Sequence, residues 1–303
     1  MLAAKAVELG IKAEHQLYGG VVPHRHVGTK AISHSLVSPD AAAPVAWHHR
    51  LGSMLEAIVP TGFTAFDAID AFLAGKQLLS LGPIRIKKVQ GTSGRGQSVV
   101  RSINELEAVL TSLDAIEIAT HGLVIEENLT ATTTYSVGTT SLMGEQIAYW
   151  GTQRLTTSNH GGEVYGGSDL CVVRGPLEAL LALKLAAGPR RAVEQALRYD
   201  GAVFQAYPGL FASRRNYDVI EGLDPSGDCR SGVLEQSWRI GGASGAEIAA
   251  FEAFRKNPEL AEVHSSTMEI FGESEPPPAH ATVYYRSIDP IVGPVTKYAM
   301  VKW

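Results

Sequence analysis

Apolar positions recur along this chain with helical spacing in some segments and strand spacing in others. The segment 64–75 predicts a helix that begins at Thr64 and ends near Gly75. The segment 102–113 predicts a second helix, because it opens on a Ser-x-x-Glu capping box and carries an apolar stripe. Further helices are predicted at 27–37, 176–187, 190–207 and 245–256.

Short apolar runs bounded by turn residues predict the strands. They lie at about 84–89, 122–129, 133–138, 145–155, 216–222 and 232–240, with a final pair at 281–301. The turn Asp-Pro-Ser-Gly at 224–227 predicts that the strands on either side of it form a hairpin. Helices and strands do not alternate regularly, so the sequence predicts an α+β fold and disfavours a doubly wound one.

Composition narrows the class of protein. Of 303 residues, 45% are hydrophobic and 19% are charged, which fits a globular core. The net charge of −5 gives no general attraction to nucleic acid or anionic membranes, and no apolar run is long enough to cross a bilayer. The two cysteines, Cys171 and Cys229, form neither a disulfide framework nor a metal pair. We therefore expect a reduced, cytoplasmic setting.

The second hairpin strand, VLEQSWR, carries charged residues on its outer face, where a strand that only covered the hydrophobic core would carry neutral polar groups. Strand alternation puts Val233, Glu235, Ser237 and Arg239 on one face. Pairing with the first strand brings Asp218 near Glu235. Two carboxylates about 4 Å apart repel by about 4 kcal/mol at an effective dielectric constant near 20, so an arginine or a divalent cation must offset them. A surface ladder of ion pairs is the structural alternative.

A glycine-rich loop, GTSGRGQ at 91–97, follows one predicted strand and precedes a helix. Such a loop can turn backbone N–H groups toward an anion, and Lys87 on the preceding strand can reach the same anion. The loop matches neither a Walker A loop nor a dinucleotide fingerprint. A plain β–α connection and solvated edge-strand lysines are the alternatives.

Three motifs in this order, IKKVQGTSGRGQ, GLVIEENL and RRNYDVIEG…GVLEQSWR, resemble the ATP-grasp superfamily. More narrowly, GGVVPH, TKAISH, EVYGGSDL and EQSWRIGGASGAE resemble a bacterial family of ATP-grasp-like proteins described as a domain of unknown function. The resemblance covers nearly the whole chain. It implies two α+β lobes that grip a nucleotide between them: a truncated N-terminal segment at 1–60, a small lobe at 61–129 and a large lobe at 130–303.

The resemblance also implies roles for individual residues. ATP would contact Lys30, Lys87, the loop residues Gly94, Arg95, Gly96 and Gln97, and the interlobe residues Glu127, Asn128 and Leu129. Mg²⁺ would be held by Asp218, Glu235 and Ser237. Arg239 and Lys87 would serve catalysis. Arg154, Arg215 and Asn216 would lie on the substrate side, next to the glycine-rich segment HGGEVYGGSD, for which an ordinary surface loop is the alternative.

Some positions depart from the superfamily pattern. Ser237 stands where a metal-binding Asn is usual, and Thr134 stands where a ribose-binding Glu is frequent. Only 29 residues precede Lys30, so we expect either a vestigial first domain or a true start upstream of Met1.

The function implied is an ATP- and Mg²⁺-dependent ligase that joins a small-molecule carboxylate to an amine or another nucleophile through an acyl phosphate. A kinase that only phosphorylates a small molecule, and a nucleotide-binding protein without chemistry, are the alternatives. The expected partners are small molecules, with neither nucleic acid nor membrane, and because many superfamily members form dimers the resemblance extends to a homodimer.

Overall fold

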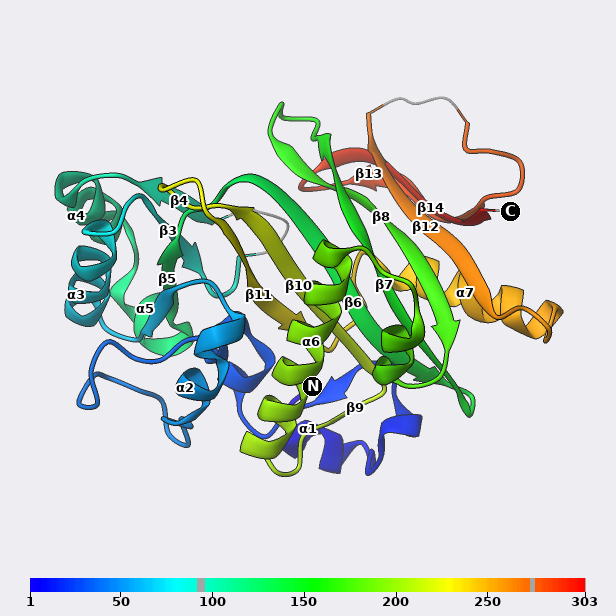
Figure 1. The fold of residues 1–303 in the computed structure, drawn as a ribbon, viewed down its shortest axis with the longest axis horizontal. Helices are drawn as coiled ribbons and strands as arrows, with labels where there is room; N and C mark the ends of the chain where they lie inside the picture. Colours follow the sequence, from blue (N-terminus) through cyan, green and yellow to red (C-terminus); the bar gives the residue numbers. More distant parts are fainter. Residues whose placement is uncertain (92–95, 273–275, 303) are drawn as a thin grey trace.

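The computed structural model describes residues 1–91, 96–272 and 276–302. Helices and antiparallel sheets are mixed along the chain, so the predicted α+β class is confirmed (Figure 1). The α-helices are α1 Ala3–Glu8, α2 Leu51–Leu55, α3 Ala68–Leu79, α4 Ile103–Ser112, α5 Ala115–His121, α6 Ala187–Ala206 and α7 Ser244–Lys256. Short 3₁₀ helices are η1 Glu14–Gln16, η2 Arg25–Gly28, η3 Lys30–Ser33, η4 Glu56–Ile58 and η5 Leu177–Ala182.

A four-stranded sheet forms the smaller lobe in the described part of the chain. Its order is β2-β5-β3-β4, and all pairs are antiparallel. The strands are β2 Gly62–Ala65, β3 Ile84–Lys88, β4 Gln97–Val100 and β5 Leu123–Glu127. Helices α3, α4 and α5 bury one face of this sheet in a shared core (Figure 1). The lobe lies close to the predicted range 61–129, although the domain division itself stays a prediction.

The start of α3 corrects one prediction. Thr64 does not cap a helix but lies in β2, and Asp67 is the cap, accepting hydrogen bonds from the N–H groups of Ile69 and Asp70. Gly75 does not end the helix either. A Cβ there would lie 2.7 Å from Leu106 Cδ2, so the glycine lets α4 approach α3 closely.

An eight-stranded antiparallel sheet forms the larger lobe in the described ranges, in the order β11-β10-β6-β7-β8-β12-β14-β13. Its strands are β6 Thr130–Leu142, β7 Glu145–Thr157, β8 Glu163–Arg174, β10 Arg214–Leu223, β11 Cys229–Ser237, β12 Glu262–Phe271, β13 Thr282–Asp289 and β14 Gly293–Lys302. Helix α6 packs on one face and α7 on the other. A separate pair joins β1 Gly20–Val21 to β9 Phe211–Ala212.

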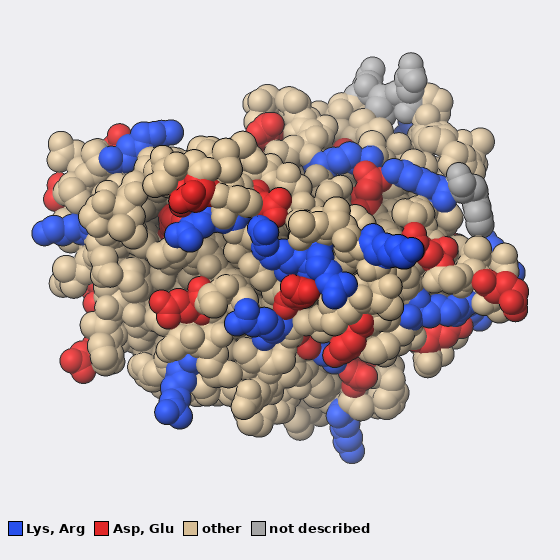
Figure 2. All heavy atoms as spheres, viewed as in Figure 1, with Lys and Arg blue, Asp and Glu red and all other residues tan. Residues whose placement is uncertain are grey.

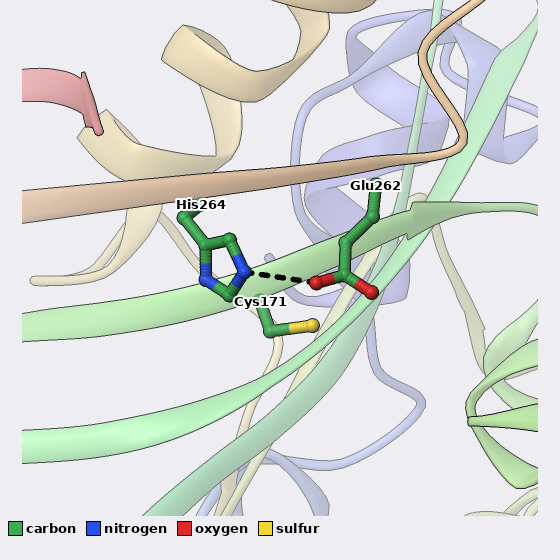
Figure 3. A group of neighbouring side chains, drawn as sticks. All are labelled: Cys171, Glu262 and His264. Atoms are coloured by element: carbon green, nitrogen blue, oxygen red, sulfur yellow. Dashed lines mark ion pairs between the residues drawn. The ribbon is translucent and has the colours of Figure 1, made fainter. Parts of the chain in front are cut away.

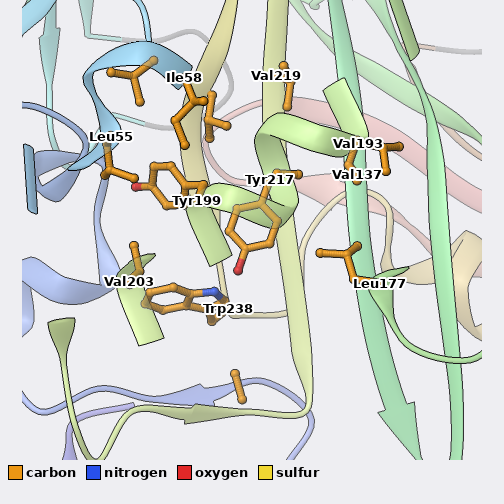
Figure 4. Packing of buried hydrophobic residues seen from close by; sticks show 14 of the residues in the cluster. Leu55, Ile58, Val137, Leu177, Val193, Tyr199, Val203, Tyr217, Val219 and Trp238 are labelled. Carbon is orange, nitrogen blue, oxygen red and sulfur yellow. The ribbon is translucent and has the colours of Figure 1, made fainter. Parts of the chain in front are cut away.

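The α6 face carries the principal core (Figure 4). Tyr199 and Val203 of α6 pack against Tyr217 and Val219 of β10, and Trp238 at the end of β11 closes the cluster. Burial of Trp238 confirms its predicted core direction. This packing fixes the hairpin β10–β11 against α6, which leaves the opposite face of the hairpin for polar residues.

Two further predictions about local structure are wrong. The segment 27–37 forms 3₁₀ turns (η2, η3) and extended backbone, not an α-helix. The segment 160–169 was predicted as a loop, but most of it belongs to β8. Its glycines let the neighbouring strands approach closely. A Cβ at Gly167 would lie 2.1 Å from the carbonyl oxygen of Thr267 on β12.

Charges on the surface are mixed. On the face in Figure 2, Lys and Arg side chains are interspersed with Asp and Glu, which agrees with the small net charge of −5. Within the described residues, no helix has the length and hydropathy that a membrane crossing requires.

Candidate functional site

The hairpin β10–β11 brings the two predicted metal acids together. Asp218 pairs directly with Glu235, and Asn216 pairs with Ser237 two positions along the ladder. A bulge follows, because Val219 pairs with Val233 and Leu234 has no opposite residue. The prediction that Val233 and Glu235 share a face is therefore wrong. Across the bulge, Val233 turns into the core while Glu235 stays on the polar face.

Asp218 is held by neutral donors. Asn216 Nδ2 donates to Asp218 Oδ1 over 2.9 Å, and Ser136 Oγ donates to the same oxygen over 3.2 Å. Tyr149 donates in turn to Asn216 Oδ1 over 2.9 Å. Burial, followed by the charge of Glu235, raises the pKa of Asp218 above its usual value. The carboxyl therefore sits where a cation would lower its free energy.

Lys30 comes to this pair from the N-terminal segment. Its Nζ lies 2.6 Å from Glu235 Oε2 and donates to the carbonyl oxygen of Gly91 over 3.2 Å. The lysine is 8% exposed, and Gly91 begins the predicted glycine-rich loop. Three segments far apart in sequence thus meet at one ammonium group.

Gln236 holds the turn that carries Lys30. Its Nε2 donates to the carbonyl oxygens of Val27 and Thr29, over 3.0 and 2.7 Å, and its Oε1 accepts from the hydroxyl of Tyr199 over 3.0 Å. The sequence pattern did not predict this role of Gln236. The available signal was a polar residue on the core-facing side of a strand, two residues before Trp238.

A cavity of about 220 Å³ opens beside these residues. Lys30, Gly91, Glu235, Ser237 and Arg239 all line it. The site therefore offers the side chains of Lys30, Glu235, Ser237 and Arg239 to a small ligand, with Asp218 directly across from Glu235.

A buried ion pair fixes the backbone at Arg239, just after the end of β11. Arg214 Nη2 lies 2.7 Å from Glu247 Oε1 of α7, and Arg214 Nη1 donates to the carbonyl oxygen of Arg239 over 2.6 Å. Arg214 is 1% exposed and Glu247 fully buried. No local sequence pattern predicts this pair, because the two residues are 33 positions apart and lie on different elements.

Lys87 lies elsewhere, on the inner face of the small sheet. It forms an ion pair with Glu126 of β5, and His34 Nε2 lies 3.4 Å from the second oxygen of Glu126. All three side chains are buried. Burial alone would raise the pKa of Glu126, but the charges and hydrogen bonds of Lys87 and His34 lower it to about 2. Lys87 does not line the cavity next to Lys30.

The remaining residues that were predicted to bind the nucleotide are spread along the small lobe. Gly94 and Arg95 lie outside the described residues. Gly96 accepts from the backbone N–H of Lys88 over 2.9 Å, and Gln97 Oε1 accepts from Arg85 over 3.1 Å. At the interlobe segment, Glu127 accepts from the N–H of Thr61 over 2.7 Å, Asn128 accepts from Arg85 over 2.8 Å, and Leu129 is buried.

Two predicted substrate arginines lie away from the acidic pair. Arg215 is on the α6 side of β10, where it pairs with Asp200 at 3.2 Å and lies over the ring of Phe204. Arg154 pairs with Asp169 at 2.9 Å on the same side of the sheet. Strand alternation puts both on the face opposite Asp218, whereas Asn216 stays beside it.

Comparison with known proteins identifies the family. A family model described as "Protein of unknown function (DUF3182)" matches residues 1–299. The chain belongs to this family. No curated protein matches the chain.

Solved structures similar to this family member are ligases and synthetases by their descriptions. Phosphoribosylamine–glycine ligase from Thermotoga maritima has a TM-score of 0.48 and 15% identity, covering 94% of this chain and 73% of that one. D-alanyl-alanine synthetase A from Vibrio cholerae O1 biovar eltor str. N16961 has a TM-score of 0.37 and 13% identity, and the match covers 61% of this chain and 52% of that one. D-cycloserine synthetase has a TM-score of 0.34 and 11% identity, and the match covers 63% of this chain and 60% of that one. The matches thus span about half to three quarters of those chains.

Proposed function

We propose that this protein binds ATP with Mg²⁺ and joins a carboxylate to an amine or another nucleophile, with release of ADP and phosphate. The observation that carries the proposal is the meeting of Lys30, Glu235 and Asp218 beside one cavity. An ammonium group paired with one of two facing carboxylates suits a ligand that combines phosphate charge with a divalent cation.

The residues present fit Mg²⁺. The donor set is made of oxygen atoms only, from Asp218, Glu235 and the hydroxyl of Ser237, as hard cations prefer. Asn216 Oδ1 already accepts from Tyr149, so Asn216 supports Asp218 and is not itself a ligand. When bound, Mg²⁺ would neutralise part of the charge on the transferred phosphoryl group.

The chain's own groups would do the rest of the work. Lys30 can bind phosphate oxygens from its position at the cavity wall, where Gln236 keeps its backbone in place. The guanidinium of Arg239 is exposed and, among the described residues, donates one hydrogen bond, to Ile240 O. Its other donors are free to orient a carboxylate and then stabilise the acyl phosphate.

The position of Lys87 favours a second candidate, a nucleotide-binding protein without chemistry. Lys87 is neutralised by Glu126, and its side chain is 6% exposed. For Lys87 to contact a phosphate, it must leave a carboxylate that is itself buried, which costs several kcal/mol. A protein that only senses the nucleotide would use Lys30 and need no second lysine.

The test is phosphate release from ATP with pools of carboxylates and of amines, supplied separately and together. We expect release only with both pools, and Glu235→Gln should lower it by roughly 100-fold or more, because the variant loses charge compensation of the phosphoryl group. Glu221→Gln is the matched control, since Glu221 lies further along β10 and pairs with Arg191. Formation of ADP and a phosphorylated product with one pool alone, without free phosphate, would favour the kinase alternative, because a kinase leaves the phosphoryl group on its substrate.

Binding measurements separate the remaining outcomes. ATP binding without formation of ADP under any pool supports the sensing candidate. If Glu235→Gln changes neither ATP binding nor phosphate release, the acidic pair has no part in function and the proposal is wrong.

A further inference from the structure

A group of potential metal ligands lies on the large sheet, far from the cavity. Cys171 of β8 pairs directly with His264 of β12, and Glu262 lies two residues before His264 on the same face. The ligand atoms of the three residues all lie within 4.8 Å of one another (Figure 3). His264 Nε2 is 2.8 Å from Glu262 Oε1. Among the described residues, this is the one group of three such side chains close enough for a metal ion.

The group is distinct from the acidic pair. Four strands, β10, β6, β7 and β8, separate β12 from β11 in the sheet. Val263, between the two β12 ligands, faces α7, so Glu262 and His264 face the other side, opposite Asp218. Ligand type differs as well: a thiol, an imidazole and a carboxylate suit Zn²⁺, whereas Mg²⁺ prefers oxygen alone.

Accessibility suits an ion that enters from solvent. The side chains of His264 and Glu262 are 60% and 39% exposed, whereas Cys171 is buried beneath them. Lys302 lies directly across from His264 on β14, and its ammonium forms an ion pair with Asp169, a carboxylate that also pairs with Arg154. The ammonium of Lys302 is thus engaged by a carboxylate other than Glu262.

Trp150 gives a second, independent observation. It pairs with Cys171 on the neighbouring strand β7. Its buried indole Nε1 has no hydrogen-bond partner among the described residues. This unpaired N–H lies on the strand next to Cys171 and can donate to a metal-bound thiolate, and such outer hydrogen bonds orient metal ligands and tune the metal.

We propose that Cys171, Glu262 and His264 bind Zn²⁺, with water in a fourth position. Binding forms a bond from the metal to the Cys171 sulfur, and the thiol proton passes to solvent. Three protein ligands with one open position are typical of zinc sites that exchange a ligand with solvent or substrate. The inference does not depend on the proposed function, because the two sites share no residue.

Cobalt is the sharpest probe, because a thiolate bound to Co²⁺ gives a charge-transfer absorption band that carboxylates and imidazoles do not. The purified full chain, stripped of metal and kept reduced, is titrated with CoCl₂ and then with ZnCl₂. We expect the band to saturate at one equivalent of Co²⁺ and to disappear as Zn²⁺ displaces it. Removing a direct ligand should weaken Zn²⁺ binding by roughly 100-fold or more, at or beyond what loss of an outer partner costs.

Variants assign the band. Cys171→Ser should abolish it, and His264→Ala should weaken metal binding without loss of folding, because His264 is exposed. Cys229→Ser is the matched control, since Cys229 is the other free cysteine and lies on β11. The Asp218→Asn variant should keep the band, which separates this site from the acidic pair. Absence of the band in the unmodified protein, or its survival in Cys171→Ser, would overturn the proposal.

Discussion

Two lysine–carboxylate pairs of this protein contain lysines with the same predicted role but differ in their surroundings. The side chains of Lys30 and Glu235 are 9% and 32% exposed and border a cavity. Those of Lys87 and Glu126 are 6% and 3% exposed and lie between the small sheet and the N-terminal segment. The resemblance predicts a nucleotide role for both lysines. The structure distinguishes a pair whose partner can be exchanged for a ligand from a pair that is sealed inside the fold.

The carboxyl groups near these lysines show the same contrast. The pKa of Glu126 is lowered to about 2, since the cationic partners outweigh the effect of burial. The pKa of Asp218 is raised, since burial and the charge of Glu235 act together. One carboxylate is compensated by its surroundings and therefore stabilises the fold. The other is not, which is expected of a group kept for binding a cation.

Replacing Lys87 by Met should give the largest effect on stability. The variant leaves the carboxylate of Glu126 buried without its main cation, which costs about 3–5 kcal/mol in the free energy of unfolding. The neighbouring Lys88→Met is the matched control, because its pair with Glu117 is 37% and 34% exposed and should contribute at most about 1 kcal/mol. Chemical denaturation measures both. Equal losses would remove the distinction between sealed and exchangeable pairs.

Acid should destabilise the protein through Glu126. Because its folded pKa of about 2 is below the ordinary value of 4.5, its contribution is complete above pH 4.5 and is lost as the pH falls toward 2. A shift of this size corresponds to about 3 kcal/mol. The free energy of unfolding, measured from pH 6 to pH 3, should fall less steeply in Glu126→Gln than in the unmodified protein. An unchanged slope would show that another group causes the acid sensitivity.

At the exchangeable pair, Lys30→Met should strengthen binding of Mg²⁺ alone. The ammonium of Lys30 competes with a cation for Glu235, and its removal is expected to raise the affinity by roughly tenfold, a small part of the Coulomb energy of adjacent charges. The measurement is the rise in melting temperature with MgCl₂ in the absence of nucleotide. Lys88→Met should leave this rise unchanged. A smaller rise in Lys30→Met would mean that the lysine and the metal do not compete.

The smallest effect on stability is expected for Asp218→Asn, and the sign of the change in the free energy of unfolding is what distinguishes the two roles of Asp218. A raised pKa means that the charged form is penalised in the folded state at neutral pH, so the variant should stabilise the fold by about 0.5–1 kcal/mol. The amide oxygen can still accept from Asn216 and Ser136. Phosphate release should nevertheless be lost. Destabilisation at neutral pH would show that Asp218 holds the hairpin together and is not kept for a ligand.

Much of the fold follows from local patterns. The hairpin around Asp224, the strand 84–88 and the cap at Ser102 are all present in the structure, because turn chemistry, alternation and capping act over a few residues. Thr64 misled the helix prediction, since Asp67 is a stronger cap and the residues before it pair with β5. The 3₁₀ turns at Lys30 depend on Gln236, more than 200 positions away, and no local pattern contains that information.

The candidate site was predictable in part for the same reason. The hairpin turn and alternation bring Asp218 near Glu235, and the bulge at Leu234 puts the two directly opposite each other. The sealing of Lys87 by His34 and Glu126 depends on how the N-terminal segment packs on the small sheet, which spacing alone does not determine. The grouping of Cys171 with Glu262 and His264 requires the pairing of β8 with β12, and β12 itself was not predicted.

The bulge at Leu234 has a consequence for how this hairpin tolerates changes in length. Leu234 is the surplus residue between the pairs Val219–Val233 and Asp218–Glu235. Losing it would restore a regular ladder and still leave the two acids face to face, whereas an added residue beyond Glu235 would turn Ser237 and Trp238 to the wrong sides. Homologous chains should therefore accept a shortening here and reject a lengthening.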